Sequence, residues 1–533
     1  MFSALLPSVA LSAERITFSL KPFGQFQIQI EDLEAFVTTG TKTTELDYYL
    51  RRLTPEQQGS LPGLLSTPLQ FEPLTVAKFS NSTVGEVAIA TLGKGIRASS
   101  TRNGFYALRG AIIAAAFDEE GLSLINLLQH YPLETVHLDL EVLTQYLQRG
   151  MAIAHNRQEI DRTWFDLSAT IAHNPSGQQP SPQIKTDRAL PTLVEKLQSL
   201  GQYTWRQRTL SYQNGPGSET RLFDLYQPEI TGSVPLIVIS HGIASNRQTF
   251  AYLGKHLASY GFAVAAIEHN EISLDQFDRI LAGTESFPQV ENLLGRPRDI
   301  SSVLDRLEAE PEIDVEQVGV IGQSFGGYNA LALSGGKLTP GVNSAVCQRE
   351  NYRYVLLDLS SLAQCSFLQR HLSQVELRDE RVKATVAINP MAKIFGQGIG
   401  SVQTPTMIIA GTNDLIMPPV TEQIRPFAGL NQDLDNYLVM VKPGTHFSFL
   451  QEGLGVLPVP DTVVGPRPIY AHPLLKSLTT AFFQVYLGPE QPVTKLQQNL
   501  KQEFKQDLTQ LDNNAFELTV IRSLRDIDLE AFK

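Results

Sequence analysis

A serine set between glycines, directly behind a short apolar run, constrains this chain of 533 residues more than any other feature. The run covers residues 318–321, and the motif Gly-Gln-Ser-Phe-Gly-Gly covers 322–327. The run predicts a buried strand, and the small and apolar residues at 328–333 predict a buried helix. A Gly-x-Ser-x-Gly motif at such a junction is typical of a serine held on a sharp turn, because glycines let strand and helix approach closely. The sequence therefore predicts that Ser324 is a nucleophile.

A serine hydroxyl becomes a good nucleophile only when a base removes its proton. Two later apolar runs end in suitable residues, since 406–410 leads into Asp414 and 437–441 leads into His446. The carboxyl ends of parallel strands meet at one edge of an open α/β sheet, where such sheets carry their chemistry. We therefore predict a triad of Ser324, Asp414 and His446, whose order along the chain is that of the α/β-hydrolase fold.

Other interpretations of these residues are possible. A single aspartate after a strand is most often a turn or capping residue, so the triad rests on all three residues together. Asp358 is the alternative acid, and it ranks lower because it lies in an insertion and does not follow a sheet strand.

Acyl transfer also needs backbone N–H groups where the carbonyl oxygen becomes negative. The N–H of Phe325, next to the nucleophile, is the first candidate. The second is the N–H of Ile243, because the apolar run 235–239 is followed by a turn at His241-Gly242. We expect His241 to support this loop and not to act as a base, although an ordinary turn is the alternative.

Three segments, 236–242, 257–269 and 319–327, resemble platelet-activating factor acetylhydrolases and bacterial relatives described as dienelactone-hydrolase-like. The resemblance extends over roughly residues 200–485. It implies an α/β-hydrolase fold, a mostly parallel sheet flanked by helices, without a cofactor. It also implies hydrolysis of short or oxidised acyl esters of phospholipids.

Two residues depart from that family's pattern. Gln323 stands where those enzymes commonly have histidine, and Asn389 stands where they carry the acid. An amide cannot stabilise an imidazolium as a carboxylate does, so the acid must come from elsewhere. The segment 404–414 resembles the acid-bearing strand of cutinase-like polyester hydrolases, which makes polyesters an alternative class of substrate.

Composition narrows the remaining classes of function. The formal net charge of −12 argues against nucleic-acid binding and against attraction to anionic membrane surfaces. The sequence contains no run of 18 apolar residues, the length that predicts a membrane-spanning helix. Its histidines and cysteines do not have the spacing of metal ligands. We expect a small-molecule or lipid ester as the partner and leave the oligomeric state open. A catalytically silent hydrolase fold that serves binding is the alternative, and the three triad residues argue against it.

The chain divides by composition. Residues 14–173 predict a mainly helical module, which resembles an uncharacterised module preceding such hydrolases in bacteria. The module is expected to begin with a hairpin over 16–30. After the module, the polar, Pro-rich stretch 174–190 predicts a linker. The catalytic domain is expected over 191–490, with a helical tail over 491–533. Within the module, helical spacing covers 31–40, 44–53, 83–92, 105–117 and 122–130, and 139–172 predicts a long or broken helix.

Two further expectations concern location and covalent bonding. Residues 1–13 are apolar and end in small residues, like the latter part of a secretory signal, so we expect export, with a cytoplasmic protein as the alternative. The insertion at 334–381 is longer than a plain crossover and predicts a lid over the acyl pocket. It contains both cysteines, Cys347 and Cys365, which suits a disulfide; two free thiols are the alternative.

Overall fold

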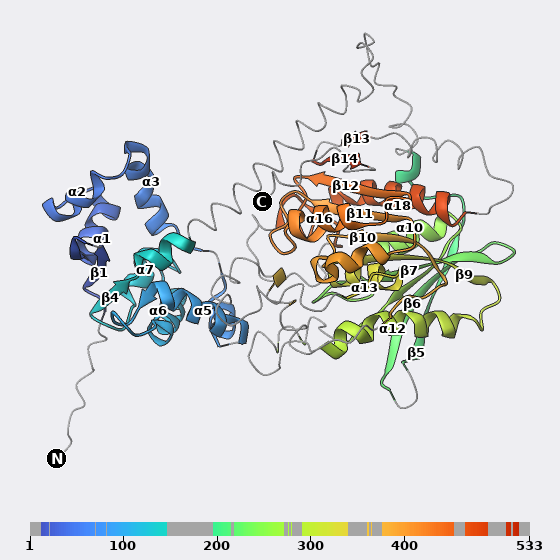
Figure 1. Cartoon of the computed structure of the whole chain (residues 1–533), viewed down its shortest axis with the longest axis horizontal. Coiled ribbons are helices and arrows are strands. Elements are labelled where there is room, and N and C mark those ends of the chain that lie inside the picture. Colours follow the sequence, from blue (N-terminus) through green and yellow to red (C-terminus); the bar gives the residue numbers. More distant parts are fainter. Residues whose placement is uncertain are drawn as a thin grey trace, which may run out of the picture.

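The computed structural model has a smaller N-terminal part and a larger part built on one long sheet (Figure 1). It describes residues 12–146 apart from 21, 70 and 82, residues 196–270 apart from 215–217, and residues 290–338, 376–451, 464–488 and 508–521 apart from 513 and 514. It also describes Gln276, Arg279, Ser360, Ser361 and Gln364.

The N-terminal part packs helices on a small four-stranded sheet of order β2-β1-β4-β3. The predicted hairpin and the five helices predicted between 31 and 130 are present, with their bounds shifted by a few residues. The strands are β1 Arg15–Leu20, β2 Gly24–Gln29, β3 Ile96–Arg97 and β4 Thr135–Leu138, and the helices are α1 Ile30–Thr39, α2 Thr44–Leu50, α3 Pro55–Ser66, α4 Pro73–Ser80, α5 Thr83–Gly95, α6 Phe105–Phe117 and α7 Leu124–Gln129. The parallel pairing of β1 with β4, which joins distant segments, was not predicted.

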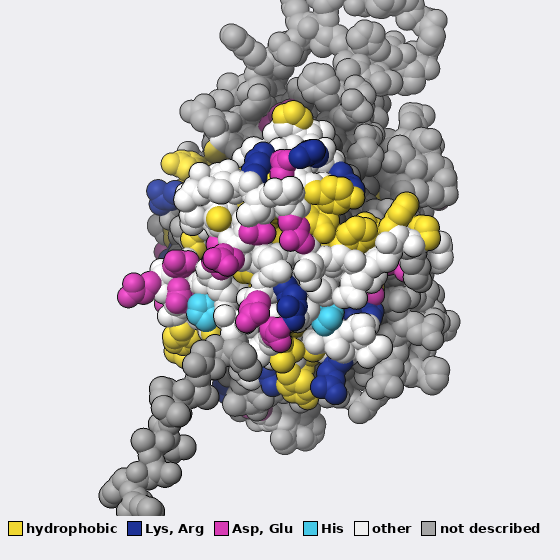
Figure 2. Space-filling view, turned by 90° about the vertical axis from the view of Figure 1, so that its left-hand side faces the viewer, with side chains coloured by type: hydrophobic (Ala, Val, Ile, Leu, Met, Phe, Trp, Pro, Cys, Tyr) yellow, Lys and Arg dark blue, Asp and Glu magenta, His cyan; other side chains and the backbone are white. Residues whose placement is uncertain are grey.

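The surface of the N-terminal part exposes several large hydrophobic side chains. Phe23 is 78% exposed, Tyr106 77% and Leu64 66%. Figure 2 shows hydrophobic side chains in small groups between acidic and basic ones on this side of the molecule.

The larger part is built on a ten-stranded sheet of order β13-β14-β12-β11-β10-β9-β7-β8-β6-β5. Strands β8, β7, β9, β10, β11 and β12 are parallel to their neighbours in that series, and antiparallel strands extend both edges. The strand bounds are β5 Trp205–Gln213, β6 Thr220–Pro228, β7 Val234–Ser240, β8 Ala263–Ile267, β9 Ile313–Gln323, β10 Val382–Ile388, β11 Thr406–Gly411, β12 Asn436–Lys442, β13 Leu508–Asp512 and β14 Glu517–Ile521.

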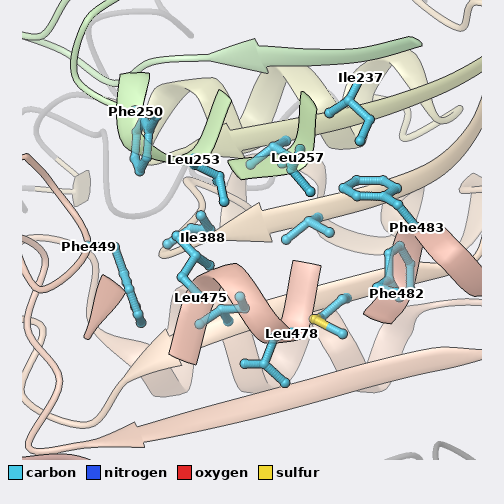
Figure 3. Packing of buried hydrophobic residues seen from close by; sticks show 14 of the residues in the cluster. Ile237, Phe250, Leu253, Leu257, Ile388, Phe449, Leu475, Leu478, Phe482 and Phe483 are labelled. Carbon is cyan, nitrogen blue, oxygen red and sulfur yellow. The ribbon is translucent and has the colours of Figure 1, made fainter. Parts of the chain in front are cut away.

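Helices cover both faces of this sheet, which explains why its central strands are apolar throughout. In β7, Ile237 and Ile239 face α10 and α18, as Figure 3 shows for Ile237. The alternate residues Leu236 and Val238 pack with α12 and α13 on the other face. The helices are α10 Ala251–Ser259, α12 Val290–Leu307, α13 Phe325–Leu333, α16 Arg425–Gly429 and α18 His472–Tyr486, with short 3-10 helices η2 Lys393–Ser401 and η4 Pro468–Tyr470 and a π-helix η3 Val420–Ile424.

The prediction of a helical C-terminal tail is wrong for the described residues of that segment. They form β13 and β14, and β14 pairs antiparallel with β12. Leu518 and Val520 alternate along β14 and are buried, so the strand places two apolar side chains in the core. It also supplies hydrogen-bond partners to the edge of β12.

Several predictions lie outside the described residues and stay predictions. They concern the N-terminal segment 1–11, the linker 174–190, most of the insertion 334–381, Asp358, and the pair Cys347 and Cys365. Of the helix predicted over 139–172, only residues 139–146 are described, and of these 140–146 are helical. Within the described residues, no helix has the length and apolarity that a membrane crossing requires.

Candidate active site

Ser324 lies on a tight turn between β9, which ends at Gln323, and α13, which begins at Phe325. Its φ is 57° and its ψ −117°, a conformation that costs energy for any residue with a Cβ. A Cβ on Gly322 would lie 1.9 Å from the backbone oxygen of Gly326, so only glycine fits there. The turn therefore has the geometry that the sequence motif predicts.

Backbone strain is concentrated around this turn. Among the described residues, three that are not glycine have a positive φ: Ala244 with 53°, Ser324 with 57° and Asn389 with 42°. Ala244 follows β7, Ser324 follows β9 and Asn389 follows β10. All three residues therefore lie at the carboxyl ends of neighbouring parallel strands, the edge where the sequence predicts a site.

His446 and Asp414 meet at the same edge of the sheet. The Nδ1 of His446 lies 2.8 Å from the Oδ2 of Asp414, and both side chains are buried. Backbone N–H groups of Ile416 and Met417 donate to the other carboxylate oxygen, at 2.8 and 2.7 Å. Because a carboxylate only accepts, Nδ1 must be the protonated ring nitrogen, which leaves the lone pair on Nε2.

Gln323 connects the serine turn to His446. Its side-chain Nε2 donates to the backbone oxygen of His446 at 3.3 Å and lies 3.3 Å from the ring Nε2. Within the described residues, no hydrogen bond joins the Ser324 hydroxyl to His446. Hydrogen bonds of this kind often tighten only when substrate is bound. The structure thus brings the three predicted residues to one edge, with Gln323 in the place where the serine hydroxyl would bind.

Asn389 has a structural role that the sequence did not reveal. Its Nδ2 donates to the backbone oxygen of Thr445, next to His446, at 3.0 Å, and its Oδ1 accepts from the N–H of Gly411 at 3.0 Å. One amide thus joins the strand that leads to Asp414 with the loop that carries His446. A carboxylate at this position could not donate to Thr445, which agrees with an acid supplied from elsewhere.

The loop after β7 packs directly against the serine turn. A Cβ on Gly242 would lie 3.2 Å from the Cβ of Ser324. The N–H of Ile243 donates no hydrogen bond to any described residue. Close packing and an N–H without a partner in the described chain are both properties of an oxyanion donor.

His241 orients the peptide that carries this N–H. Its Nε2 accepts from the backbone N–H of His269 at 3.0 Å, so its Nδ1 donates to the oxygen of Gly242 at 2.7 Å. Burial is the main cause that holds the pKa of His241 well below its usual value, and the nearby His269 and Arg296 lower this pKa further. The ring is therefore neutral at neutral pH and supports the loop, as the sequence suggested.

A buried polar cluster lies beneath this loop and was not predicted. Asp299 on α12 is paired with Arg221 and accepts from Asn214 at 2.7 Å. Its Oδ2 lies 3.5 Å from the Nδ1 of His269, whose Nε2 lies 2.9 Å from the Ser240 hydroxyl. These contacts join residues far apart in the sequence, so no local pattern signals them. Among the described residues, no group of three or more His, Cys, Asp or Glu could hold a metal ion.

Three families match parts of the chain. Residues 12–139 match "Alpha/beta hydrolase of unknown function (DUF1400)", residues 187–353 match "PET hydrolase-like" and residues 294–453 match "Prolyl oligopeptidase family". The last two together cover strands β5 to β12 of the sheet that carries Ser324, whereas the first covers the N-terminal part. Together with the fold, these matches confirm the prediction of the α/β-hydrolase family and its fold.

Individual relatives are similar over shorter stretches. Platelet-activating factor acetylhydrolase of Canis lupus familiaris is 34% identical over 159 residues, which are 22% of this chain and 35% of the relative. The enzyme of the same name from Bos taurus is 32% identical over 137 residues, 18% of this chain and 31% of the relative. Bis(hydroxyethyl) terephthalate hydrolase of Streptomyces coelicolor is 26% identical over 227 residues, 42% of this chain and 54% of the relative. The chain thus spans about a third to a half of these curated relatives.

Proposed function

We propose that this chain is a serine hydrolase that cleaves carboxylic esters through an acyl-enzyme intermediate. One observation carries the proposal: a buried His446–Asp414 pair, 2.8 Å apart, lies at the sheet edge where Ser324 is held on a strained turn. A base oriented by a carboxylate beside a serine is the arrangement that activates a hydroxyl. The relatives named as acetylhydrolase and terephthalate hydrolase support an ester as the substrate.

In the first half-reaction, the Oγ of Ser324 attacks the ester carbonyl carbon while its proton moves to the Nε2 of His446. The carbonyl oxygen becomes negative and accepts from the N–H groups of Ile243 and Phe325. His446 then gives the proton to the departing alkoxide oxygen, the ester bond breaks and an alcohol leaves. Asp414 accepts from Nδ1 throughout and stabilises the transient imidazolium.

In the second half-reaction, His446 takes a proton from water while the water oxygen attacks the acyl-enzyme. The tetrahedral intermediate collapses as the bond to Ser324 breaks, and Ser324 Oγ recovers the proton from His446. A carboxylic acid is released, so the sum of both halves is ester hydrolysis without a cofactor.

Lipid or other short-acyl esters are the substrates we favour, because two of the relatives act on platelet-activating factor by name. Buried hydrophobic residues lie close to the serine, among them Met391, whose N–H donates to the oxygen of Ser324 at 3.1 Å. Polyester fragments are the second candidate, since the match to the "PET hydrolase-like" family covers the serine turn.

Purified protein assayed on p-nitrophenyl esters from acetyl to palmitoyl, on an oxidised phospholipid and on bis(hydroxyethyl) terephthalate tests both candidates. We expect turnover of esters by the wild type and none by Ser324→Ala at an unchanged melting temperature. The acyl-length profile separates lipid from polyester preference. A wild type without ester turnover, or a Ser324→Ala variant as active as wild type, would reject the proposal.

A further inference from the structure

Arg296 is a fully buried cation that contacts both sides of the proposed oxyanion hole. It lies on α12, and none of its surface is exposed. Its Nη1 donates to the backbone oxygen of His241 at 3.1 Å. The Cζ of its guanidinium lies over the Phe325 ring, 4.6 Å from the ring centroid.

Burying an arginine costs several kcal/mol unless it gains compensating contacts, so its position needs an explanation. Asp299 lies one turn further along α12 and is buried as well, but it is also paired with Arg221. His241 and His269 are neutral, because burial, as the main cause, lowers the pKa of each well below its usual value. Arginine stays protonated in proteins, so Arg296 places a positive charge beside the loop after β7.

The contacts of Arg296 fix the two residues whose N–H groups would hold an oxyanion. The peptide after His241 is held by Arg296 at its oxygen, and the next peptide is held by the His241 ring at the oxygen of Gly242. Because a trans peptide is planar, fixing that second oxygen also fixes the direction of the Ile243 N–H. On the other side, packing against the Phe325 ring restrains the residue that carries the second N–H.

We infer that Arg296 is a positioning residue that sets the spacing between the N–H groups of Ile243 and Phe325. The inference rests on the proposed function, since an oxyanion forms only if Ser324 attacks an acyl carbon. Arginine suits the role because its planar fork donates in its own plane while its face stacks on an aromatic ring, which lysine cannot do. Oxyanion donors act only within a narrow range of distance, so a small shift of either one lowers the rate.

The test compares Arg296→Met and Arg296→Lys with wild type and with Arg381→Met as a matched control. Arg381 also contacts α12, through Asp305, but it precedes β10, at the sheet edge opposite Ser324. Each variant is assayed for kcat and KM on one p-nitrophenyl ester, for inhibition by an arylboronic acid, which mimics the tetrahedral intermediate, and for its melting temperature.

For Arg296→Met we expect kcat to fall about tenfold to a hundredfold with KM within about twofold of wild type, because the lost interaction acts in the transition state. Arylboronic acid should bind more weakly by a similar factor. Arg296→Lys should recover part of the loss, and Arg381→Met should keep kcat and boronic-acid affinity even if it melts at a lower temperature.

Unchanged kcat and boronic-acid affinity in Arg296→Met would overturn the inference, as would an equal loss in Arg381→Met. If Arg296→Met does not fold, Arg296→Lys decides: the inference requires a lower kcat at a near-wild-type melting temperature, and wild-type kcat rejects it. A wild type that turns over no ester rejects the proposed function and this inference together. An active wild type with an unchanged Arg296→Met rejects the inference alone.

Discussion

The side-chain amide of Gln323 lies against the Nε2 of His446, the ring nitrogen to which a serine hydroxyl would donate. The backbone oxygen of His446 can only accept, so the Gln323 nitrogen must face it, and the same nitrogen approaches the ring Nε2. At 3.3 Å both contacts are at the long limit of hydrogen bonds and are weak. A serine hydroxyl can therefore displace Gln323 from Nε2 at little cost, without displacing it from the backbone oxygen.

Asp414→Asn should lower kcat by about 10⁴. The carboxylate accepts from three N–H groups, those of Ile416, Met417 and the His446 ring. An asparagine that keeps its oxygen on the two backbone groups must turn its NH2 toward Nδ1, which forces the proton onto Nε2. Steady-state kinetics measure the loss, and a variant within about tenfold of wild type would contradict the assignment.

Asn389→Asp should destabilise the protein by about 1–3 kcal/mol, because a carboxylate would face the oxygen of Thr445 without a hydrogen bond. It should also lower kcat, since Thr445 precedes His446. Urea unfolding and ester kinetics measure both effects. A variant that is as stable and active as wild type would show that the amide does not hold the histidine loop.

The positions of Ser324, Asp414 and His446 at one end of the parallel strands could be predicted because each follows an apolar run that forms a strand, whereas the residues that contact them could not. Asn389, His241 and Arg296 are held by contacts with residues far away in the chain, such as the 55-residue separation between Arg296 and His241. Only His241 stands in a motif, next to a glycine, that indicated a supporting role. Tertiary contacts of this kind leave no periodic signal in a single sequence.

At the scale of elements, the central strands were predictable, whereas the outer strands β13 and β14 were not. Strands such as β7 and β11 are buried on both faces and read as unbroken apolar runs. Half of the residues of β13 and β14 are polar or charged, and the pairing of β14 with β12 is what holds the hairpin to the sheet. That dependence explains why the sequence suggested a helical tail.

Deleting residues 508–533 should lower the melting temperature and promote aggregation. The deletion removes Phe516, Leu518 and Val520 from the core and exposes the edge of β12, which leads to the His446 loop. Thermal unfolding and size-exclusion chromatography report both effects. A truncated protein that melts and elutes like the full chain would show that the hairpin adds nothing to the sheet.

At the scale of the whole molecule, stability depends also on buried groups outside the proposed triad. Glu422 on η3 accepts from Gln364 at 2.7 Å and from Ser360, two residues of the insertion. Its other oxygen accepts from the N–H groups of Ala392 and Lys393 at 3.0 and 2.9 Å. One buried carboxyl thus joins the insertion to the segment that follows β10.

Glu422→Gln should become relatively more stable than wild type as pH rises. Burial raises the pKa of Glu422, so the folded state holds the proton more tightly than the unfolded state. That contribution is complete below the ordinary pKa of glutamate and is lost as pH rises through the raised value. Melting temperatures of both proteins between about pH 4 and pH 8 measure it, and a difference independent of pH would contradict it.

Mass spectrometry of the protein labelled with a fluorophosphonate probe tests the central claim, a covalent serine nucleophile, most directly. We predict one adduct per chain on the peptide that contains Ser324, strongly reduced in His446→Gln and absent in Ser324→Ala. An adduct on another residue, or undiminished labelling of Ser324→Ala, would contradict the account.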